Sequence, residues 1–265
     1  LAVSAVIVMI VLYGIVPGVV KVGGWFELLF VNVLGLPFNT GLYVYIFAIF
    51  ATLVAGIYCS EKGKSQTLVA GLFTLAIALL GIPFYGNNVG ISILIGVIVL
   101  STIFIIGTRC STNYKGGTVT KRYLIKRRGF NTSFLCLLLI MIGYSSYTLI
   151  VVRSAANTPM DQNSPEDIFT LGTYLAREQY GDRPLLYGQS YNSKVALKVV
   201  GNQCIADVEE GAPIYQRKEK KSANEQDRYE LVKYKEKYKY AQNMIFPRMY
   251  SSEPNHVTAY EQWLG

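Results

Sequence analysis

Apolar residues are concentrated in residues 1–152, in five long stretches that contain no charged side chain. At about 1.5 Å of rise per residue, a helix of this length crosses roughly 30 Å of hydrocarbon. A buried helix of a soluble protein would show a polar stripe at 3.6-residue spacing, and these stretches show none. The pattern predicts five transmembrane helices, near residues 1–20, 41–58, 67–84, 89–107 and 132–152.

The composition changes at residue 152. Residues 1–152 hold ten Lys and Arg but two acids, whereas residues 153–265 hold fifteen of each. The formal net charge of +8 therefore belongs to the apolar half, between the predicted helices, which argues against a nucleic-acid partner. We expect a polytopic α-helical membrane protein followed by an α+β extracytoplasmic domain. Because Leu1 lies inside an apolar run, we expect an internal fragment of a longer protein. We also expect the soluble domain, residues 153–265, to be incomplete.

The connecting segments predict an orientation, because cationic loops stay on the cytoplasmic side. The segment 109–130 carries seven Lys and Arg and no acid, so it is predicted to be a basic cytoplasmic loop. Alternation of the five helices then places residues 153–265 on the extracytoplasmic, periplasmic side. The predicted location is the inner (cytoplasmic) membrane, crossed several times.

The segment 21–40 is too apolar for a solvated loop and too interrupted by Gly and Pro for a full span. We therefore expect an interfacial loop, with Trp25 at head-group depth. Glu27 is the acid in this segment, and an ionisable residue at such depth often has a role. It is a candidate for lining a cavity for a lipid-linked substrate. Alternatively, Glu27 pairs with Lys21 or faces water.

Two patterns predict local structure in the polar half. The run from Ser164 to Asp167 reads as a helix start with Ser164 as N-cap, so a helix is expected over 165–180. From Tyr229 to Tyr240 apolar and lysine residues alternate with a period of two, which predicts a long strand or hairpin with a lysine-rich solvent face. The segment 217–228 has no apolar period and is expected to be an exposed loop.

The sequence offers little for metal or nucleophilic chemistry. The four cysteines, Cys59, Cys110, Cys136 and Cys204, lack CxxC spacing, and His256 is the single histidine. A multi-histidine metal site and a Ser-His-Asp triad are therefore not expected, and no cofactor is evident.

Several motifs resemble a family of large polytopic proteins of Bacteroidetes that contain domain of unknown function 2723. That family is similar to protein O-mannosyltransferases, which are membrane glycosyltransferases of the GT-C class. The motifs are residues 142–147, 152–154, 163–167, 177–181 and 184–188, with further segments at 24–27, 35–39, 246–252 and 255–256.

The resemblance implies a glycosyltransferase that moves a mannose-type sugar from a lipid-phosphate carrier to an extracytoplasmic protein. Its partners would be membrane lipid, the lipid-phosphate-linked sugar donor and the acceptor protein. The catalytic acid of such enzymes would lie upstream of Leu1, so this fragment alone is expected to be inactive. The candidate substrate-binding residues are Trp25, Glu27, Asp161, Asn163, Glu166, Asp167, Arg177 and Glu178. Capping and surface ion pairs are the alternative role of the residues in the polar half.

The sequence suggests two other functions. One is a non-enzymatic, membrane-anchored periplasmic binding or envelope-assembly module. The other is a transporter or flippase, which the absence of charged residues within the predicted spans disfavours. An acid in a loop before Leu1 would discriminate the enzyme from the assembly module.

Overall fold

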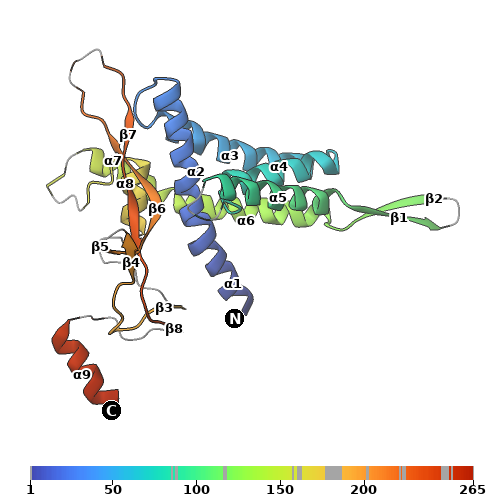
Figure 1. Ribbon diagram of the computed structural model, residues 1–265. Helices are drawn as coiled ribbons and strands as arrows, with labels where there is room; N and C mark the ends of the chain where they lie inside the picture. The colour runs from blue at the N-terminus through green and yellow to red at the C-terminus, as the bar shows by residue number, and fades with distance from the viewer. Residues whose placement is uncertain are drawn as a thin grey trace. The chain divides into compact units, whose positions relative to one another are not determined.

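The computed structural model describes residues 2–84, 86, 89–115, 118–156, 158–159, 163–176, 187–200, 203–220, 222, 225–245, 251 and 253–264. The chain divides into two compact units. Unit 1 contains Leu1–Ala176 and Tyr215–Glu230, and unit 2 contains Arg177–Ile214 and Leu231–Gly265. Figure 1 labels the α-helices and strands of both units.

Unit 1 is mainly helical. Its helices are α1 (Ala2–Ile10), η1 (Val11–Ile15), α2 (Val16–Leu28), η2 (Leu29–Val33), α3 (Thr40–Glu61), α4 (Gln66–Leu79), α5 (Val89–Thr108), α6 (Arg127–Tyr144), α7 (Ser146–Ala155) and α8 (Ile168–Leu175). Between α5 and α6, strands β1 (Cys110–Lys115) and β2 (Thr118–Tyr123) form an antiparallel hairpin that pairs Cys110 with Tyr123.

Helices α3, α4, α5 and α6 pack side by side, with their axes roughly aligned (Figure 1). The connection from α3 to α4 is a short turn, whereas the connection from α5 to α6 contains the β1–β2 hairpin. The Gln66 side-chain amide donates hydrogen bonds to the carbonyl oxygens of Gly107 (3.4 Å) and Ile125 (3.1 Å), which ties three helix ends together. We call this the basic end, because Lys62, Lys64, Lys126, Arg127 and Arg128 all lie there.

Large apolar side chains fill the space between these helices. Tyr45, Leu53 and Phe134 have no exposed surface (0%). The ring of Phe134 lies over Gly56, where a Cβ would approach it to within 2.4 Å, so α6 meets α3 at a position that needs glycine. Phe73 of α4 contacts Phe134 edge-on, with ring centroids 5.5 Å apart. These contacts form the core of unit 1.

Four helical stretches are long and apolar enough to cross a membrane: Ser4–Val33, Thr40–Glu61, Gly90–Thr108 and Arg127–Ala155. The prediction of about five such helices is corrected at α4, which has 14 residues and is about 21 Å long at 1.5 Å per residue. The helix ends because Gly81 takes a positive φ of 72° and Pro83 follows. The coarser prediction, several long apolar helices followed by a smaller strand-containing region, is confirmed.

Helix α2 runs across the bundle at the end opposite the basic end (Figure 1). Close backbone contact makes this crossing possible, since a Cβ on Gly18 would lie 2.5 Å from the carbonyl oxygen of Leu80. Lys21 extends from α2 and donates hydrogen bonds to the carbonyl oxygens of Phe84 (3.1 Å) and Gly86 (2.6 Å) and to Ser92 Oγ (3.0 Å). Helix α2 is thereby fastened to the loop between α4 and α5.

Three predicted segments differ from the structure. The segment 21–40, expected to be an interfacial loop, is helical as far as Val33 and forms a loop from Leu34 to Asn39. The expected basic loop 109–130 contains the β1–β2 hairpin and the first turn of α6. The helix expected over 165–180 is α8, which begins at Ile168 and ends at Leu175.

Unit 2 contains short strands and one described helix, α9 (Pro254–Leu264). The strands β3 (Tyr187–Gln189) and β8 (Asn243–Ile245) pair antiparallel, as do β4 (Leu197–Val200) and β5 (Gln203–Ala206). Strands β6 (Val208–Arg217) and β7 (Tyr229–Tyr238) pair with each other and continue from unit 2 into unit 1. The strand predicted within 229–240 is thus confirmed as β7, but all its residues after Tyr229 are exposed, so the lysines do not form a separate solvent face. Among its described residues, unit 2 has no buried side chain.

Candidate functional site

The carboxylate of Glu27 lies at the start of α3 and has no exposed surface (0%). One oxygen accepts hydrogen bonds from the backbone N–H of Asn39 (2.5 Å) and from the Tyr229 hydroxyl (3.2 Å), and the other accepts from Leu42 N–H (3.0 Å). The first N–H groups of a helix lack partners within the helix and carry partial positive charge. Glu27 therefore satisfies and stabilises the N-terminus of α3 from a neighbouring helix.

The helices can approach closely enough for this contact because Gly41 stands in the first turn of α3. A Cβ at Gly41 would lie 2.6 Å from the Glu27 Cα. Asn39, the residue before α3, has a positive φ of 67° and makes no side-chain cap of its own. The cap that a local residue would normally supply is provided by Glu27 instead.

Tyr229, at the start of β7, links this carboxylate to the hairpin segment of unit 1. Its backbone N–H donates to Asn32 Oδ1 (2.8 Å), and its carbonyl oxygen accepts from Asn32 Nδ2 (3.0 Å). Its ring contacts those of Phe38 and Phe169 edge-on. Burial raises the pKa of the Tyr229 hydroxyl, and the negative charges of Asp167 and Glu27 raise it further. The hydroxyl therefore remains protonated and donates to Glu27.

Asp167 is the N-cap of α8. Its Oδ1 accepts from the backbone N–H groups of Phe169 (3.0 Å) and Thr170 (2.8 Å), and the Thr170 hydroxyl oxygen accepts from Asp167 N–H (3.1 Å). This is a reciprocal capping box. The prediction of Ser164 as N-cap is wrong, because Asp167 makes these bonds and Ser164 lies outside the helix with a positive φ of 37°.

Arg217, at the end of β6, joins the two acids that precede α8. Its Nη1 lies 3.1 Å from Glu166 Oε2, and its Nε lies 3.2 Å from Asp167 Oδ2. Its Nη2 also donates to the Glu166 carbonyl oxygen (2.9 Å). The guanidinium lies over the Phe38 ring, 5.1 Å from the centroid. We call Glu27, Asn32, Glu166, Asp167, Arg217 and Tyr229 the Glu27–Arg217 cluster.

The geometry of the cluster indicates a structural role, in which its hydrogen bonds and ion pairs hold segments of unit 1 together. Asp167 is buried, and the oxygens of Glu27 and Asp167 are already engaged by the donors described above. Chemistry on a substrate would need one of these carboxylates to be reachable, and Glu27 has no exposed surface (0%). Among the described residues, no group of three or more His, Cys, Asp or Glu side chains could hold a metal ion. The cluster joins α2, α3, α8 and the 215–230 segment within unit 1.

The other predicted site residues lie apart from this cluster or outside the described residues. Trp25 is half-buried on α2, with its ring edge-on to Phe84 at 5.4 Å and the Lys21 ammonium 5.6 Å from its centroid. Asn163 is exposed in the turn before α8, with a positive φ of 64°. Asp161, Arg177 and Glu178 lie outside the described residues. A substrate-binding role for these residues stays a prediction.

Sequence reasoning missed Arg217, Tyr229 and Asn32. Arg217 opens a segment that was expected to be an exposed loop, yet it is half-buried against Glu166 and Asp167. The suggested Glu27–Lys21 pair is also replaced, since each residue has other partners. One local signal was present: glycines at 18, 23, 24 and 41 mark where α2 meets other helices closely.

Comparison with known proteins finds a similarity in the C-terminal part of the chain. Residues 181–265 match the model of a family of unknown function (DUF8416). The matched region contains Arg217 and Tyr229 together with most of unit 2, but none of the four long apolar helices. No curated protein and no solved structure matches the chain.

This match corrects the family resemblance inferred from the motifs. The chain does not match the family of domain of unknown function 2723 or the O-mannosyltransferases, and the Bacteroidetes assignment falls with them. Motifs such as residues 142–147 and 163–167 are short runs of common residues, and here they correspond to the junction of α6 with α7 and to the turn before α8. Such runs arise from membrane helices and caps in general, so they did not identify a family.

Proposed function

We propose that the chain is a membrane-anchored binding or envelope-assembly module, in which unit 1 is the anchor and the strands of unit 2 bind a protein partner. The observation that carries this proposal is the contrast in burial: the described core lies in unit 1, and unit 2 has no buried side chain among its described residues. A pair of short strands without a covered face is marginally stable in water. A partner that covers such a face would stabilise it.

The β4–β5 hairpin supplies the clearest contact surface. Leu197 pairs with Ala206 and Val199 pairs with Cys204, so these four side chains lie on one face of the hairpin. All four are exposed, Leu197 at 67% and Val199 at 69%. On the other face, Lys198 pairs with Ile205. We call the first set the β4–β5 apolar face. Contiguous exposed apolar surface of this kind is typical of protein contact sites.

The proposed location is an inner membrane, crossed several times, with residues 153–265 on the extracytoplasmic side. The basic end supports this orientation, because cationic segments are retained in the cytoplasm. The exit of the chain after α7 then lies on the opposite side. A glycosyltransferase fed by a lipid-linked sugar was expected only from the family resemblance. With that resemblance overturned, no observation favours it over the assembly module.

The partner contact is testable by site-directed photo-cross-linking of the full chain in membranes. A photoreactive residue at Val199 should give one discrete adduct, either with another protein or with a second copy of the chain. The matched control is Lys198, the neighbouring residue on the opposite face of the same strand. It should give little or none of that adduct. Equal labelling from both positions, or no adduct from Val199, would refute the proposed contact.

The orientation is testable with single-cysteine variants. Cys204 and Cys110 are both exposed, so sidedness rather than burial decides their reaction with a membrane-impermeant maleimide. In intact spheroplasts Cys204 should be labelled, and Cys110 should be labelled only after permeabilisation. Labelling of Cys110 in intact cells would reverse the proposed topology.

A further inference from the structure

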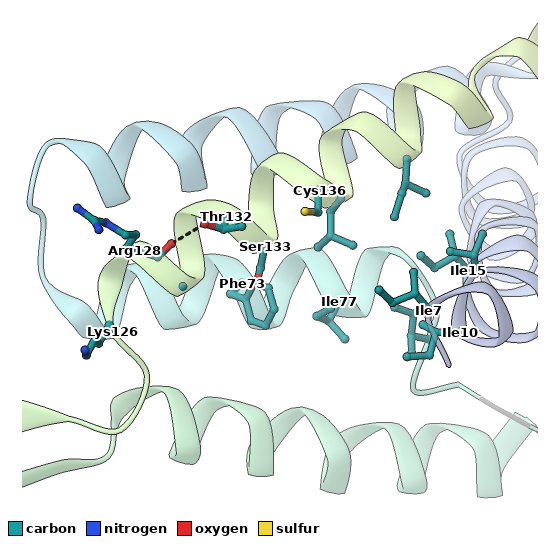
Figure 2. Close-up of a pocket in the computed structure, with 15 residues that line it drawn as sticks. Ile7, Ile10, Ile15, Phe73, Ile77, Lys126, Arg128, Thr132, Ser133 and Cys136 are labelled. Atoms are coloured by element: carbon teal, nitrogen blue, oxygen red, sulfur yellow. Dashed lines mark hydrogen bonds between the residues drawn. The ribbon is translucent and has the colours of Figure 1, made fainter. Parts of the chain in front are cut away.

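A long apolar groove lies within unit 1, between α6, α4 and the first helical turns of the chain. Its volume is about 770 Å³, within the roughly 300–1,000 Å³ typical of ligand pockets. The walls come from α6 and from Phe73 and Ile77 of α4 (Figure 2). Ile7, Ile10 and Ile15 close one end, and Lys126 and Arg128 lie at the other. We call this the α4–α6 groove.

The dimensions of the groove match one leaflet of a bilayer. Its lining along α6 extends from Arg128 to Ile140, which is about 18 Å at 1.5 Å of rise per residue. Half of a roughly 30 Å hydrocarbon core is about 15 Å. The middle of the groove is lined by apolar side chains with two hydroxyls, and that of Thr132 is satisfied internally by the carbonyl oxygen of Arg128 (3.0 Å). An extended hydrocarbon chain fits such a lining.

The charged residues that line the α4–α6 groove lie at one end of it. Among the described residues neither Lys126 nor Arg128 forms an ion pair, and both side chains are exposed. Arg127, between them, is directed elsewhere, because its Nη2 donates to the carbonyl oxygen of Lys64 (2.7 Å). Two cations with free donors thus lie at the end of the α4–α6 groove that is nearest the basic end. A ligand that complements both features carries an anionic group at the end of a hydrocarbon chain.

We propose that the α4–α6 groove binds one anionic phospholipid, with an acyl chain along α6 and the phosphate between Lys126 and Arg128. Charge complementarity selects the head group, since Lys and Arg donate charge-assisted hydrogen bonds to phosphate oxygens. The apolar length selects a lipid over a soluble phosphate. The inference does not depend on the partner contact of unit 2, because every lining residue belongs to unit 1.

The test is retention of lipid by the purified full chain. The protein is extracted from nanodiscs of equal parts phosphatidylglycerol and phosphatidylcholine, and bound lipid is counted by native mass spectrometry. We expect one phosphatidylglycerol per chain. The Lys126→Gln/Arg128→Gln double variant should lose roughly 30-fold in affinity for it. The matched control Lys62→Gln/Lys64→Gln removes the same charge from the basic end outside the groove and should retain the lipid.

A second pair of variants tests the position of the acyl chain. Ser133→Trp fills the groove and should abolish retention of either lipid, whereas Leu139→Trp, at an exposed α6 position outside the groove, should not. In wild-type protein, added phosphatidylglycerol should also slow alkylation of Cys136, which lines the groove.

Four outcomes would overturn the proposal. They are equal retention of both lipids by the wild type, equal loss in the two charge variants, unchanged retention in Ser133→Trp, and displacement of the lipid by millimolar inorganic phosphate. The first three would indicate non-specific annular lipid, and the last a free-phosphate site. The melting temperature of each variant in detergent shows that these comparisons are made on folded protein.

Discussion

Unit 1 and unit 2 differ in how far they bury apolar and polar side chains. In unit 1 apolar rings pack between helices, and the buried carboxylates of Glu27 and Asp167 are matched by donors from elsewhere in the unit. In unit 2 the described backbone is hydrogen-bonded in strands, while Leu197 and Val199 face outward. Strand pairing alone satisfies the backbone but removes little apolar surface from water. The described core therefore lies in unit 1, and unit 2 is the region for which we propose a protein partner.

The strongest test of this contrast is Glu27→Ala. The change leaves two buried backbone N–H groups and the Tyr229 hydroxyl without an acceptor, and each unsatisfied donor costs about 1–3 kcal/mol. We expect the free energy of unfolding to fall by about 4 kcal/mol, measured by denaturant titration in detergent. Glu61→Gln, at the far end of α3 where the side chain is exposed, is the control and should change little. A loss of under about 1 kcal/mol for Glu27→Ala would contradict the capping role.

Gly18→Ala tests the close crossing of α2. The added methyl group would meet the Leu80 carbonyl oxygen at 2.5 Å, and overpacking of this kind costs about 1–3 kcal/mol. We expect a loss near the upper end, read from the same titration. Gly143→Ala is the control of opposite sign. Its Cβ would meet nothing within 4 Å, so alanine should stabilise helix α6 by up to about 1 kcal/mol.

Arg217→Ala tests the link between β6 and the start of α8. It leaves Asp167 buried beside Tyr229 without its cation, and we expect a loss of about 2 kcal/mol, since Arg217 is partly exposed. Arg217→Lys should recover about half, because lysine keeps the charge but not the forked geometry. Lys218→Ala removes a cation whose pairs with Glu225 and Glu230 are solvent-accessible, and should cost much less than Arg217→Ala. Equal losses for Arg217→Ala and Lys218→Ala would show that the Asp167 pair is no stronger than a surface pair.

Tyr229→Phe should cost about 1 kcal/mol at pH 8, because one hydrogen bond to Glu27 is lost. It should also change the pH profile. The pKa of Tyr229 is raised in the folded state by burial and by the charges of Asp167 and Glu27. Its contribution to stability is therefore complete below the unfolded pKa of about 10 and is lost as the pH rises above it. Wild type should lose more stability than Tyr229→Phe between pH 10 and about 12. Parallel profiles would contradict this assignment.

The smallest effect is expected in unit 2. Leu197→Ser/Val199→Ser replaces two exposed apolar side chains, and surface substitutions usually change stability by under about 0.5 kcal/mol. Unfolding should be unchanged, whereas the cross-linked adduct should disappear when the photoreactive residue is placed at Cys204, on the same face of the hairpin. A loss of several kcal/mol would mean that these side chains belong to a core.

Part of the fold was predictable because it depends on local periodicity. Long apolar stretches give helices α3, α5 and α6 whatever their neighbours, since a backbone in an apolar setting must satisfy its own hydrogen bonds. The alternation from Val232 to Tyr238 gives strand β7. The interruption at Gly81 and Pro83 was visible in the sequence, but its consequence for the length of α4 was missed.

The candidate site was predictable only in its members Glu27, Glu166 and Asp167. Their acidic character in short polar segments drew attention to them, but the same character suited substrate binding, capping and ion pairing alike. The short motifs that suggested a glycosyltransferase family were similarly ambiguous, and the family match to residues 181–265 excluded that reading.

The sequence by itself therefore determined which segments are apolar helices, which run alternates as a strand, and where the excess positive charge lies. The tertiary structure decided what the charged residues do. Tyr229 reaches Glu27 across 202 positions of the chain, and Arg217 reaches Glu166 across 51. Such contacts leave no period in the sequence, because they depend on how the helices and the hairpin pack in space. The same holds for the α4–α6 groove, whose walls come from separate helices.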